Sequence, residues 1–378
     1  MEKIVMSKKK ILFIIYSLAG GGAEKALITL LQKFDYNCFD VDLLLFIKEG
    51  VYLKNIPKEV NLKCMYSSIE SFCTKIDFIM VNKLGLSYRY KQQIRSKVQY
   101  YDTIVSFTEQ ALKYHSWIFD RAKKNISWIH TDLLNFHYTV GENFSIEKER
   151  DAFSKLDNIV FVSNDAKKQF EKLYPDNKIK KTVIYNLIDS EAISRYRKNY
   201  DCDLEDRIFN IVSVGRLHSI KGFDRLIRIA KKLKDDNYKF HIKIIGEGEE
   251  RINLENLISE YHLEEYVSLS GYVNPPYSLM ADADLFVSTS LAEGYSLVLC
   301  EAFCLGLPVV STKTTGPIEL IDNNKYGLLT DHDDESIYSA VKEMIEDKDL
   351  RMYYHQQALK RVEVFNVSEV LNRIYSVL

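Results

Sequence analysis

The sequence lacks the features that mark several classes of protein. Its 378 residues include only 15 glycines and 6 prolines, too few for a collagen-like or low-complexity chain. No segment approaches the roughly 20 consecutive apolar residues that a membrane-spanning helix needs. The apolar run 11–18 is short, leads into glycines and precedes no small-residue cleavage site. We therefore expect it to form a buried strand and not a signal peptide.

The spacing of the cysteines indicates neither a set of disulfides nor a metal site. The 6 cysteines are scattered, no Cys-x-x-Cys pair occurs, and no histidine stands at the spacing of a zinc site. Reduced thiols are the simpler expectation and favour a cytoplasmic protein. The positions are Cys38, Cys64, Cys73, Cys202, Cys300 and Cys304.

Length and charge predict two domains of different electrostatic character. A chain of 378 residues is about twice as long as an ordinary domain, and its hydrophobic fraction of 46% supports sizeable cores. The net charge of −2 conceals an asymmetry. Residues 1–188 carry 29 Lys and Arg against 21 Asp and Glu, whereas residues 189–378 carry 22 against 32.

A basic segment in the first half is interleaved with tyrosines. It runs from Lys83 to Lys97 and includes Arg89, Lys91 and Arg95. Such a segment can hold an anionic surface, for example a layer of lipid headgroups. The charge run by itself favours a solvated helix face, so the sequence leaves both interpretations open.

The first half repeats a short apolar run, a turn and a segment of helical periodicity. After the turn Gly20–Gly22, residues 23–34 place Ala26, Leu27 and Leu30 on one face of a helix. Strands and helices that alternate in this way predict a parallel sheet covered on both faces. The expected strands are 11–18, 41–47, 103–107, 127–130 and 158–162.

A polar, charged stretch separates this half from a second one with the same rhythm. We expect a first domain at 1–190, a linker at 191–208, a second domain at 209–360, and a helix at 361–378 that returns to the first domain. Two open α/β sheets place a ligand at the carboxyl ends of their strands. The second half is expected to contain strands 209–214, 240–245, 266–269, 284–288 and 309–311 and helices 222–233, 249–261, 276–283 and 296–305.

The segment 288–302 combines two carboxylates with the start of a helix. Glu293 is expected in the loop and Glu301 about a turn and a half inside the helix, so both can address one ligand. Between them, the free backbone N–H groups of residues 294–298 suit a phosphate. Two isolated glutamates would be surface residues, but Glu301 stands among apolar neighbours, where an unpaired charge is costly. The pattern favours a nucleotide-sugar site.

The segment 213–223 adds two cations after a strand. Arg216 and Lys221 suit a diphosphate, because an arginine fork binds two oxygens and lysine is a compact charge. Gly215 and Gly222 permit close approach of the backbone. Two cations in a surface loop are commonplace by themselves. Together with the segment that carries Glu293 and Glu301, they indicate a diphosphate site.

With these motifs, the chain resembles family 4 of the retaining glycosyltransferases. That family has the GT-B fold, an α/β architecture of two Rossmann-like domains whose parallel sheets face one another across a cleft. The matching stretches occur in the same order as in the family, span nearly the whole chain, and match more closely in the C-terminal half. The matching stretches are 20–25, 213–222, 244–248, 293–301 and 306–310.

The resemblance implies a role for each matching residue. Glu293 would contact the donor sugar, Glu301 the ribose, and Arg216 and Lys221 the diphosphate. The base, expected to be uracil, would lie against residues 271–273. The residues expected to bind the donor are Gly21, Gly22, Gly215, Arg216, Lys221, Gly271, Tyr272, Val273, Glu293, Gly294, Tyr295, Ser296, Leu297, Val298 and Glu301.

The resemblance also places residues of the first domain near the reaction. The turn Gly20–Gly22 would approach the diphosphate, and His130 would lie close to the reaction centre. Without the resemblance, a lone histidine is more often a core or capping residue. The residues expected to act in catalysis are His130, Arg216, Lys221 and Glu293.

Three other features have simpler interpretations. Asp282 and Asp284 have the Asp-x-Asp form of a metal site, but they lead directly into a core strand, and the family works without a metal. The turn Gly20–Gly22 lacks the spacing of a dinucleotide fingerprint, which argues against NAD. Cys300 and Cys304, four apart on a helix, are expected to be small core side chains.

We therefore expect a retaining, metal-independent hexosyltransferase that needs no cofactor and uses a UDP-sugar as co-substrate. The basic first domain suits a lipid-linked saccharide acceptor at the inner face of the cell membrane, with no nucleic-acid partner. The resemblance is best to bacterial enzymes of capsule, exopolysaccharide or O-antigen synthesis. Two alternatives are a UDP-N-acetylglucosamine 2-epimerase, whose pattern lacks the glutamate helix, and a non-catalytic partner, which would not need Arg216, Lys221, Glu293 and Glu301 together.

Overall fold

The computed structural model describes residues 7–68, 87–141, 144–200 and 207–378. The chain forms two compact units. Unit 1 comprises Met1–Leu187 and Ser368–Leu378, and unit 2 comprises Ile188–Val367. Lys83, Cys73, Cys202 and the middle of the expected linker lie outside the described residues.

Unit 1 contains a 7-stranded parallel sheet with strand order β3-β2-β1-β4-β5-β6-β7. Its strands read as continuous apolar runs because helices cover both faces. In β1, for example, residues 11–15 are at most 1% exposed. The elements are β1 (Lys9–Ile15), α1 (Gly22–Gln32), β2 (Phe39–Ile47), β3 (Asn61–Tyr66), α3 (Ser87–Lys97), β4 (Tyr101–Ser106), α4 (Leu112–His115), β5 (Ala122–Ile129), α5 (Ile146–Ser154), β6 (Asn158–Phe161), α6 (Asn164–Leu173), β7 (Lys181–Val183) and α15 (Val367–Val377).

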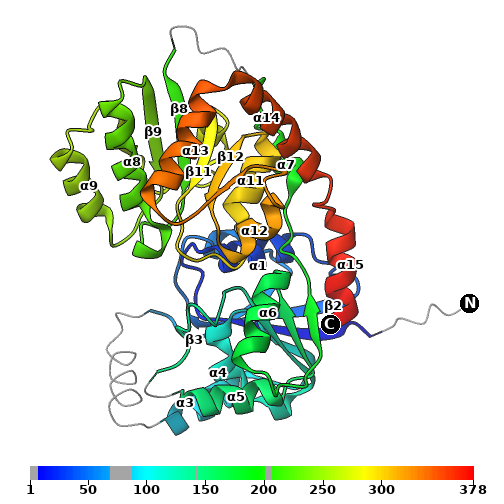
Figure 1. Ribbon diagram of the computed structural model, residues 1–378. Helices are drawn as coiled ribbons and strands as arrows, with labels where there is room; N and C mark the ends of the chain where they lie inside the picture. The colour runs from blue at the N-terminus through cyan, green and yellow to red at the C-terminus, as the bar shows by residue number, and fades with distance from the viewer. Residues whose placement is uncertain (1–6, 69–86, 142–143, 201–206) are drawn as a thin grey trace, which may run out of the picture. The chain divides into compact units, whose positions relative to one another are not determined.

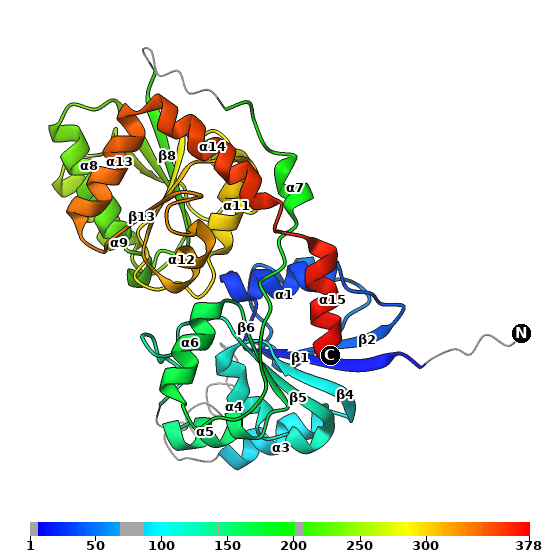
Figure 2. The same cartoon turned by 45° about the vertical axis from the view of Figure 1, so that its right-hand side comes forward.

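The last helix, α15, belongs to unit 1 although it is the far end of the chain. Both ribbon views show it beside β2 (Figures 1 and 2). The ring of Tyr375 lies 5.3 Å from that of Phe34 and 5.1 Å from that of Phe39. The Thr103 hydroxyl donates to the backbone carbonyl of Leu378 at 2.7 Å. The segment expected to be one helix at 361–378 is instead the end of α14 and a separate helix α15.

Unit 2 contains a 6-stranded parallel sheet with strand order β10-β9-β8-β11-β12-β13. The expected strands 209–214 and 240–245 are confirmed to the residue. The expected helix 276–283 contracts to the single turn α10. The elements are α7 (Ser190–Ser194), β8 (Phe209–Val214), α8 (Phe223–Asp235), β9 (Phe240–Ile245), α9 (Arg251–Glu260), β10 (Val267–Leu269), α10 (Tyr277–Met280), β11 (Leu285–Ser288), α11 (Leu297–Leu305), β12 (Val309–Thr312), α12 (Thr315–Ile321), β13 (Leu328–Thr330), α13 (Asp334–Glu346) and α14 (Lys348–Val362).

The stretch expected to be a linker begins as a structured part of unit 2. Helix α7 packs on α11, where the Arg197 side chain donates through Nε to the carbonyl of Cys304 at 3.1 Å. The Ser194 hydroxyl donates to the same carbonyl at 3.3 Å. Carbonyls in the last turn of a helix have no partner within the helix, so they recruit donors from a neighbouring segment.

Candidate functional site

In unit 2 the structure brings Lys221 and Glu293 together. Lys221 Nζ lies 2.5 Å from Glu293 Oε1, and their side chains are only 25% and 13% exposed. The Ser290 hydroxyl donates to the same carboxylate oxygen at 2.9 Å. The two segments that the sequence identified separately therefore form one site.

Backbone contacts explain why these two loops meet. They follow β8 and β11, which are neighbours in the sheet. The Thr289 hydroxyl donates to the carbonyl of Gly222 at 2.8 Å, and the Leu291 N–H donates to the carbonyl of Ile220 at 2.7 Å. Gly222 has a φ of +62°, and a Cβ there would lie 2.3 Å from the carbonyl oxygen of Thr289. Only glycine permits this contact without strain.

Helix α11 begins at this site with its N-terminus uncapped by a side chain. Ser296 is the N-cap residue, and its buried hydroxyl has no hydrogen-bond partner in the part of the chain that the structure describes. The helix is apolar nearly throughout, and Glu301 is only 2% exposed within it. The first-turn N–H groups of such a helix favour an anion. Of the expected contact residues before and in its first turn, Gly294, Tyr295, Ser296 and Leu297 are buried and Val298 is half-buried.

Two residues of the site were missed from the sequence. The Thr315 hydroxyl and the Gly316 N–H both donate to the backbone carbonyl of Glu293, the latter at 3.1 Å. A Cβ at Gly316 would lie 2.7 Å from Cα of Tyr295. The Thr-Gly-Pro sequence that opens α12 just after β12 was the available signal, since a helix start at a strand's carboxyl end belongs to the same edge.

Arg216 does not join the Lys221–Glu293 pair. Its Nη2 lies 3.7 Å from Glu249 Oε2, and its side chain is 64% exposed. His218 Nε2 lies 3.3 Å from Oε1 of the same glutamate. An ion pair this exposed contributes little stability, so Arg216 can exchange partners at small cost.

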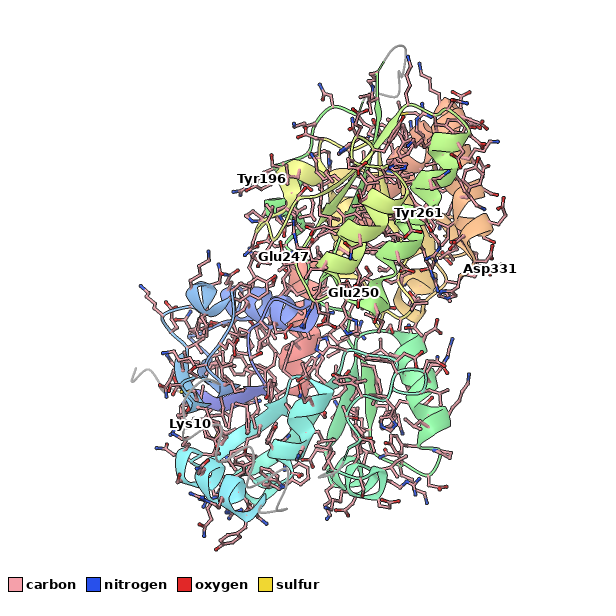
Figure 3. All side chains as sticks on the ribbon, turned by 90° about the vertical axis from the view of Figure 1, so that its left-hand side faces the viewer. Lys10, Tyr196, Glu247, Glu250, Tyr261 and Asp331 are labelled. Atoms are coloured by element: carbon pink, nitrogen blue, oxygen red, sulfur yellow. The ribbon has the colours of Figure 1, made fainter. Side chains whose placement is uncertain are left out.

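Two of the glycines expected at the donor site, Gly215 and Gly271, lie together with Gly246 at the ends of β8, β10 and β9. The Gly246 N–H donates to the carbonyl of Gly271 at 2.9 Å. A Cβ on Gly246 would lie 1.8 Å from the carbonyl oxygen of Gly215, so glycine is required there. Beyond them, Tyr272 is 43% exposed and Val273 half-buried. Glu247, labelled in Figure 3, continues this edge after β9.

In unit 1 the turn Gly20–Gly22 opens α1. Gly21 is the N-cap residue and makes no side-chain cap, and Gly22 is the first helical residue. The Glu24 carboxylate lies against this turn. A Cβ on Gly21 would be only 2.2 Å from Glu24 Oε2. A carboxylate at a helix N-terminus is stabilised by the helix dipole, and an incoming phosphate would compete with it.

His130 follows directly after β5. Burial lowers the pKa of its imidazole to about 3, although a hydrogen bond to the Phe107 backbone works in the opposite direction. Its ring lies 5.0 Å from the ring of Phe107. Its Nε2 is buried and has no hydrogen-bond partner among the described residues. The imidazole is therefore neutral at pH 7 and keeps one nitrogen available.

The residues with simpler interpretations are engaged in the fold. Asp284 pairs with Arg207 at 2.7 Å, and Asp282 pairs with Lys198. Cys300 and Cys304 are fully buried on α11, where burial raises the pKa of the Cys304 thiol to about 12. Both cysteines are core side chains, as expected.

The described part of the chain contains neither a helix that could span a membrane nor a group of metal ligands. Within ranges 7–68, 87–141, 144–200 and 207–378, no helix has both the length and the apolar character needed to cross a membrane. Over the same ranges, no three His, Cys, Asp or Glu side chains are grouped as metal ligands.

Comparison with known proteins defines the class. The family described as Glycosyl transferases group 1 matches residues 196–361. A relative in Campylobacter jejuni is 31% identical over 366 residues, covering 95% of this chain and 96% of its own length. It is named N-acetylgalactosamine-N,N'-diacetylbacillosaminyl-diphospho-undecaprenol 4-alpha-N-acetylgalactosaminyltransferase. The chain therefore belongs to the group 1 glycosyl transferases, and it is a glycosyltransferase.

Solved structures share its fold. Anabaena Alr3699/HepE in complex with UDP and glucose superposes with a TM-score of 0.77 at 21% identity, covering 97% of this chain and 98% of that chain. Staphylococcus aureus TarM, as a mutant in complex with fondaparinux, alpha-GlcNAc-glycerol and UDP, gives 0.74 at 14% identity, covering 98% of this chain and 99% of that chain. With the two parallel sheets, these likenesses confirm the expected GT-B fold.

Proposed function

We propose that this glycosyltransferase moves a sugar from a UDP-sugar to a hydroxyl of a lipid-linked saccharide, with retention of the anomeric configuration and without a metal. The observation that carries the proposal is the Lys221–Glu293 pair, at 2.5 Å, beside the uncapped N-terminus of α11. A cation and a helix dipole suit a diphosphate. The adjacent carboxylates, Glu293 and the buried Glu301, suit sugar and ribose hydroxyls.

Catalysis would then be largely electrostatic. Lys221 and the first-turn N–H groups of α11 stabilise the charge that develops on the departing diphosphate. Arg216 joins them when it leaves Glu249. In the front-face route that the family implies, the leaving phosphate oxygen takes the proton of the acceptor hydroxyl. His130, neutral because its pKa is about 3, offers a hydrogen bond and not a charge.

The donor and acceptor classes are supported by relatives. Alr3699/HepE and TarM were solved with UDP. The Campylobacter relative is named for an acceptor linked to diphospho-undecaprenol. Others are named for colanic acid and O-antigen biosynthesis. We accordingly place the reaction in the synthesis of a bacterial surface polysaccharide.

We propose that the enzyme meets its lipid-linked acceptor at the cytoplasmic face of a membrane, where α3 would supply a cationic surface. Arg89, Lys91 and Lys97 are exposed on this helix, and Arg95 pairs with Asp120 at 2.6 Å. Anionic vesicles should therefore sediment the protein at low salt and release it at high salt. Absence of binding at low salt would remove this part of the proposal.

A transfer assay tests the function. Wild-type protein, a panel of UDP-sugars and a lipid-diphosphate-linked saccharide are incubated with EDTA, and the anomeric configuration of the product is read by NMR. An isomerised UDP-sugar without transfer would favour the epimerase alternative, and donor binding without turnover a non-catalytic partner.

The matched variants are Lys221→Ala and Lys231→Ala. Both lysines pair with a carboxylate, but Lys231 is bound to Asp235 on the exposed surface of α8. Losing Lys221 should reduce transfer at least 100-fold with the fold intact, since a charged group at a developing charge contributes about 3 kcal/mol or more. Wild-type turnover in Lys221→Ala would contradict the site. Glu301→Gln, which keeps the side-chain volume, should also be severely impaired.

A further inference from the structure

The loop that follows β5 in unit 1 exposes apolar side chains in a regular pattern. Between residues 131 and 141, polar or buried side chains alternate with exposed apolar ones. This arrangement reverses the usual one, in which a surface loop presents polar groups to water. We call the exposed set the apolar loop face; its members are Leu134 (39% exposed), Phe136 (37%), Tyr138 (43%) and Val140 (36%).

Buried carboxylates hold this loop in place. Glu149, on α5, is fully buried; it accepts from the Thr139 hydroxyl and lies 2.6 Å from His137 Nε2. Asp132 is 4% exposed and accepts from the backbone N–H groups of Leu134 and Asn135, each at 3.1 Å. Burying a carboxylate is costly unless donors satisfy it, so these contacts define one loop conformation.

A third buried carboxylate connects the loop to His130. Glu109 is 1% exposed, and its Oε1 accepts from the backbone N–H groups of His130 and of Thr131, the latter at 2.7 Å. Its Oε2 accepts from the Tyr138 hydroxyl at 2.9 Å. The same carboxylate therefore fixes the backbone at His130 and the ring of Tyr138.

The aromatic members of the apolar loop face form a pair. The rings of Phe136 and Tyr138 are stacked, with centroids 5.6 Å apart and an interplanar angle of 29°. A single exposed aromatic residue needs no explanation. These two rings, of which Tyr138 is held by the buried Glu109, follow the carboxyl end of a parallel strand, where α/β sheets bind ligands.

We infer that Phe136 and Tyr138 bind the apolar face of a pyranose ring of the acceptor. Glu109 is the positioning residue, because it fixes the Tyr138 ring relative to the backbone of His130. The inference rests on the proposed function, because it names the residues that bind the acceptor in that reaction. Flat, rigid aromatic side chains lose little conformational entropy on binding and match the C–H face of a sugar.

Steady-state kinetics on the full chain test this assignment. The probe is the diphospho-undecaprenol acceptor for which the Campylobacter relative is named, with donor in excess. Phe136→Ala should raise the acceptor KM about five- to tenfold, the range of an aromatic contact, with kcat within about twofold and donor KM unchanged. The control is Tyr353→Ala, an aromatic residue of α14 that is 47% exposed and stacks edge-on with Tyr354. It should leave every constant unchanged.

Variants at the anchor separate binding from positioning. Tyr138→Phe keeps the ring but loses the hydrogen bond to Glu109, so kcat should fall more than the acceptor KM rises. Glu109→Gln keeps an oxygen for the two backbone N–H groups and should rescue much of the kcat that Glu109→Ala loses. If Glu109 only stabilised the fold, Glu109→Ala would lower the free energy of unfolding but would change neither kcat nor the acceptor KM of the folded protein.

When the wild type is active, two results would overturn the inference. One is an unchanged acceptor KM in both Phe136→Ala and Tyr138→Ala while the wild type transfers sugar. The other is loss of vesicle binding in Phe136→Ala with normal acceptor KM, which would assign the apolar loop face to a bilayer. If the wild type transfers no sugar, the proposed function fails separately. Saturation-transfer NMR with methyl N-acetyl-α-D-galactosaminide then compares the contacts of the sugar ring with the wild type and with Phe136→Ala. Equal contacts in the two proteins would contradict the inference.

Discussion

At the residue scale, buried ionisable groups in unit 1 make its stability depend on pH. His115 is fully buried between Ser106 and Asn125, and burial lowers the pKa of its imidazole to about 4. In the unfolded chain the pKa is about 6.5. Below pH 6.5 the unfolded state therefore binds a proton that the folded state rejects until about pH 4. Stability is complete above pH 6.5 and declines as the pH falls through that window.

A variant without this titration should lose less stability in acid. Between pH 8 and pH 5, His115 accounts for about 2 kcal/mol of the wild-type loss, so the unfolding free energy of His115→Gln should fall by about that much less. Urea unfolding of both proteins at the two pH values measures the difference. Parallel losses in the two proteins would show that His115 titrates normally in the fold.

Gly222 ties the backbone to the candidate donor site. It adopts a left-handed conformation against the carbonyl of Thr289, next to Lys221. Gly222→Ala should cost about 2–4 kcal/mol of stability, from the left-handed backbone and the 2.3 Å clash together, and should weaken donor binding as well. Gly141→Ala is the control for stability, since a Cβ there meets nothing within 4 Å. Equal unfolding midpoints for both variants would contradict this account.

At the scale of elements, α15 secures unit 1. Tyr375 packs against Phe34 and Phe39, and the backbone N–H of Asp35 donates to its hydroxyl at 2.9 Å. Tyr375→Ala should lower the free energy of unfolding by about 2–4 kcal/mol, as expected for removal of a packed aromatic side chain. Ser376→Ala, exposed on the same helix, should change it by less than about 0.5 kcal/mol. Similar urea midpoints for the two variants would show that α15 contributes little.

Periodicity was enough to predict most elements that carry the site. The strands at β8 and β9 and the helix at α11 follow from apolar runs bounded by polar turns. The returning helix was expected as one helix at 361–378, because no Gly or Pro in this segment marks the break between α14 and α15. The three-residue edge strands β7 and β13 were not identified, whereas β10, equally short, was expected within the run 266–269.

The site itself was predictable only in part. Charge and spacing identified Lys221 and Glu293, and the structure brings them to 2.5 Å. Arg216 carries the same signal but pairs with Glu249, because a flexible exposed side chain takes the nearest countercharge. The contacts of Thr315 and Gly316 with the backbone of Glu293 depend on tertiary folding and leave no charge pattern in the sequence.

At the scale of the whole molecule, the candidate roles divide between the two units. Lys221, Glu293 and α11 all belong to unit 2, whereas His130 and Glu109 belong to unit 1. Donor binding can therefore be measured separately from transfer. Substitutions at Glu109 should lower kcat, Phe136→Ala should raise the acceptor KM, and neither should change the affinity for the donor.

The most direct test of the central claim is a thermal-shift screen of wild type and Lys221→Ala against UDP-sugars with EDTA present. A ligand at 100 times its Kd stabilises the folded state by about 2.7 kcal/mol, a shift of about 5 °C or more for a domain of this size. The account predicts such a shift for the wild type with at least one UDP-sugar and little or none for Lys221→Ala. No shift with any UDP-sugar, or equal shifts in both proteins, would contradict it.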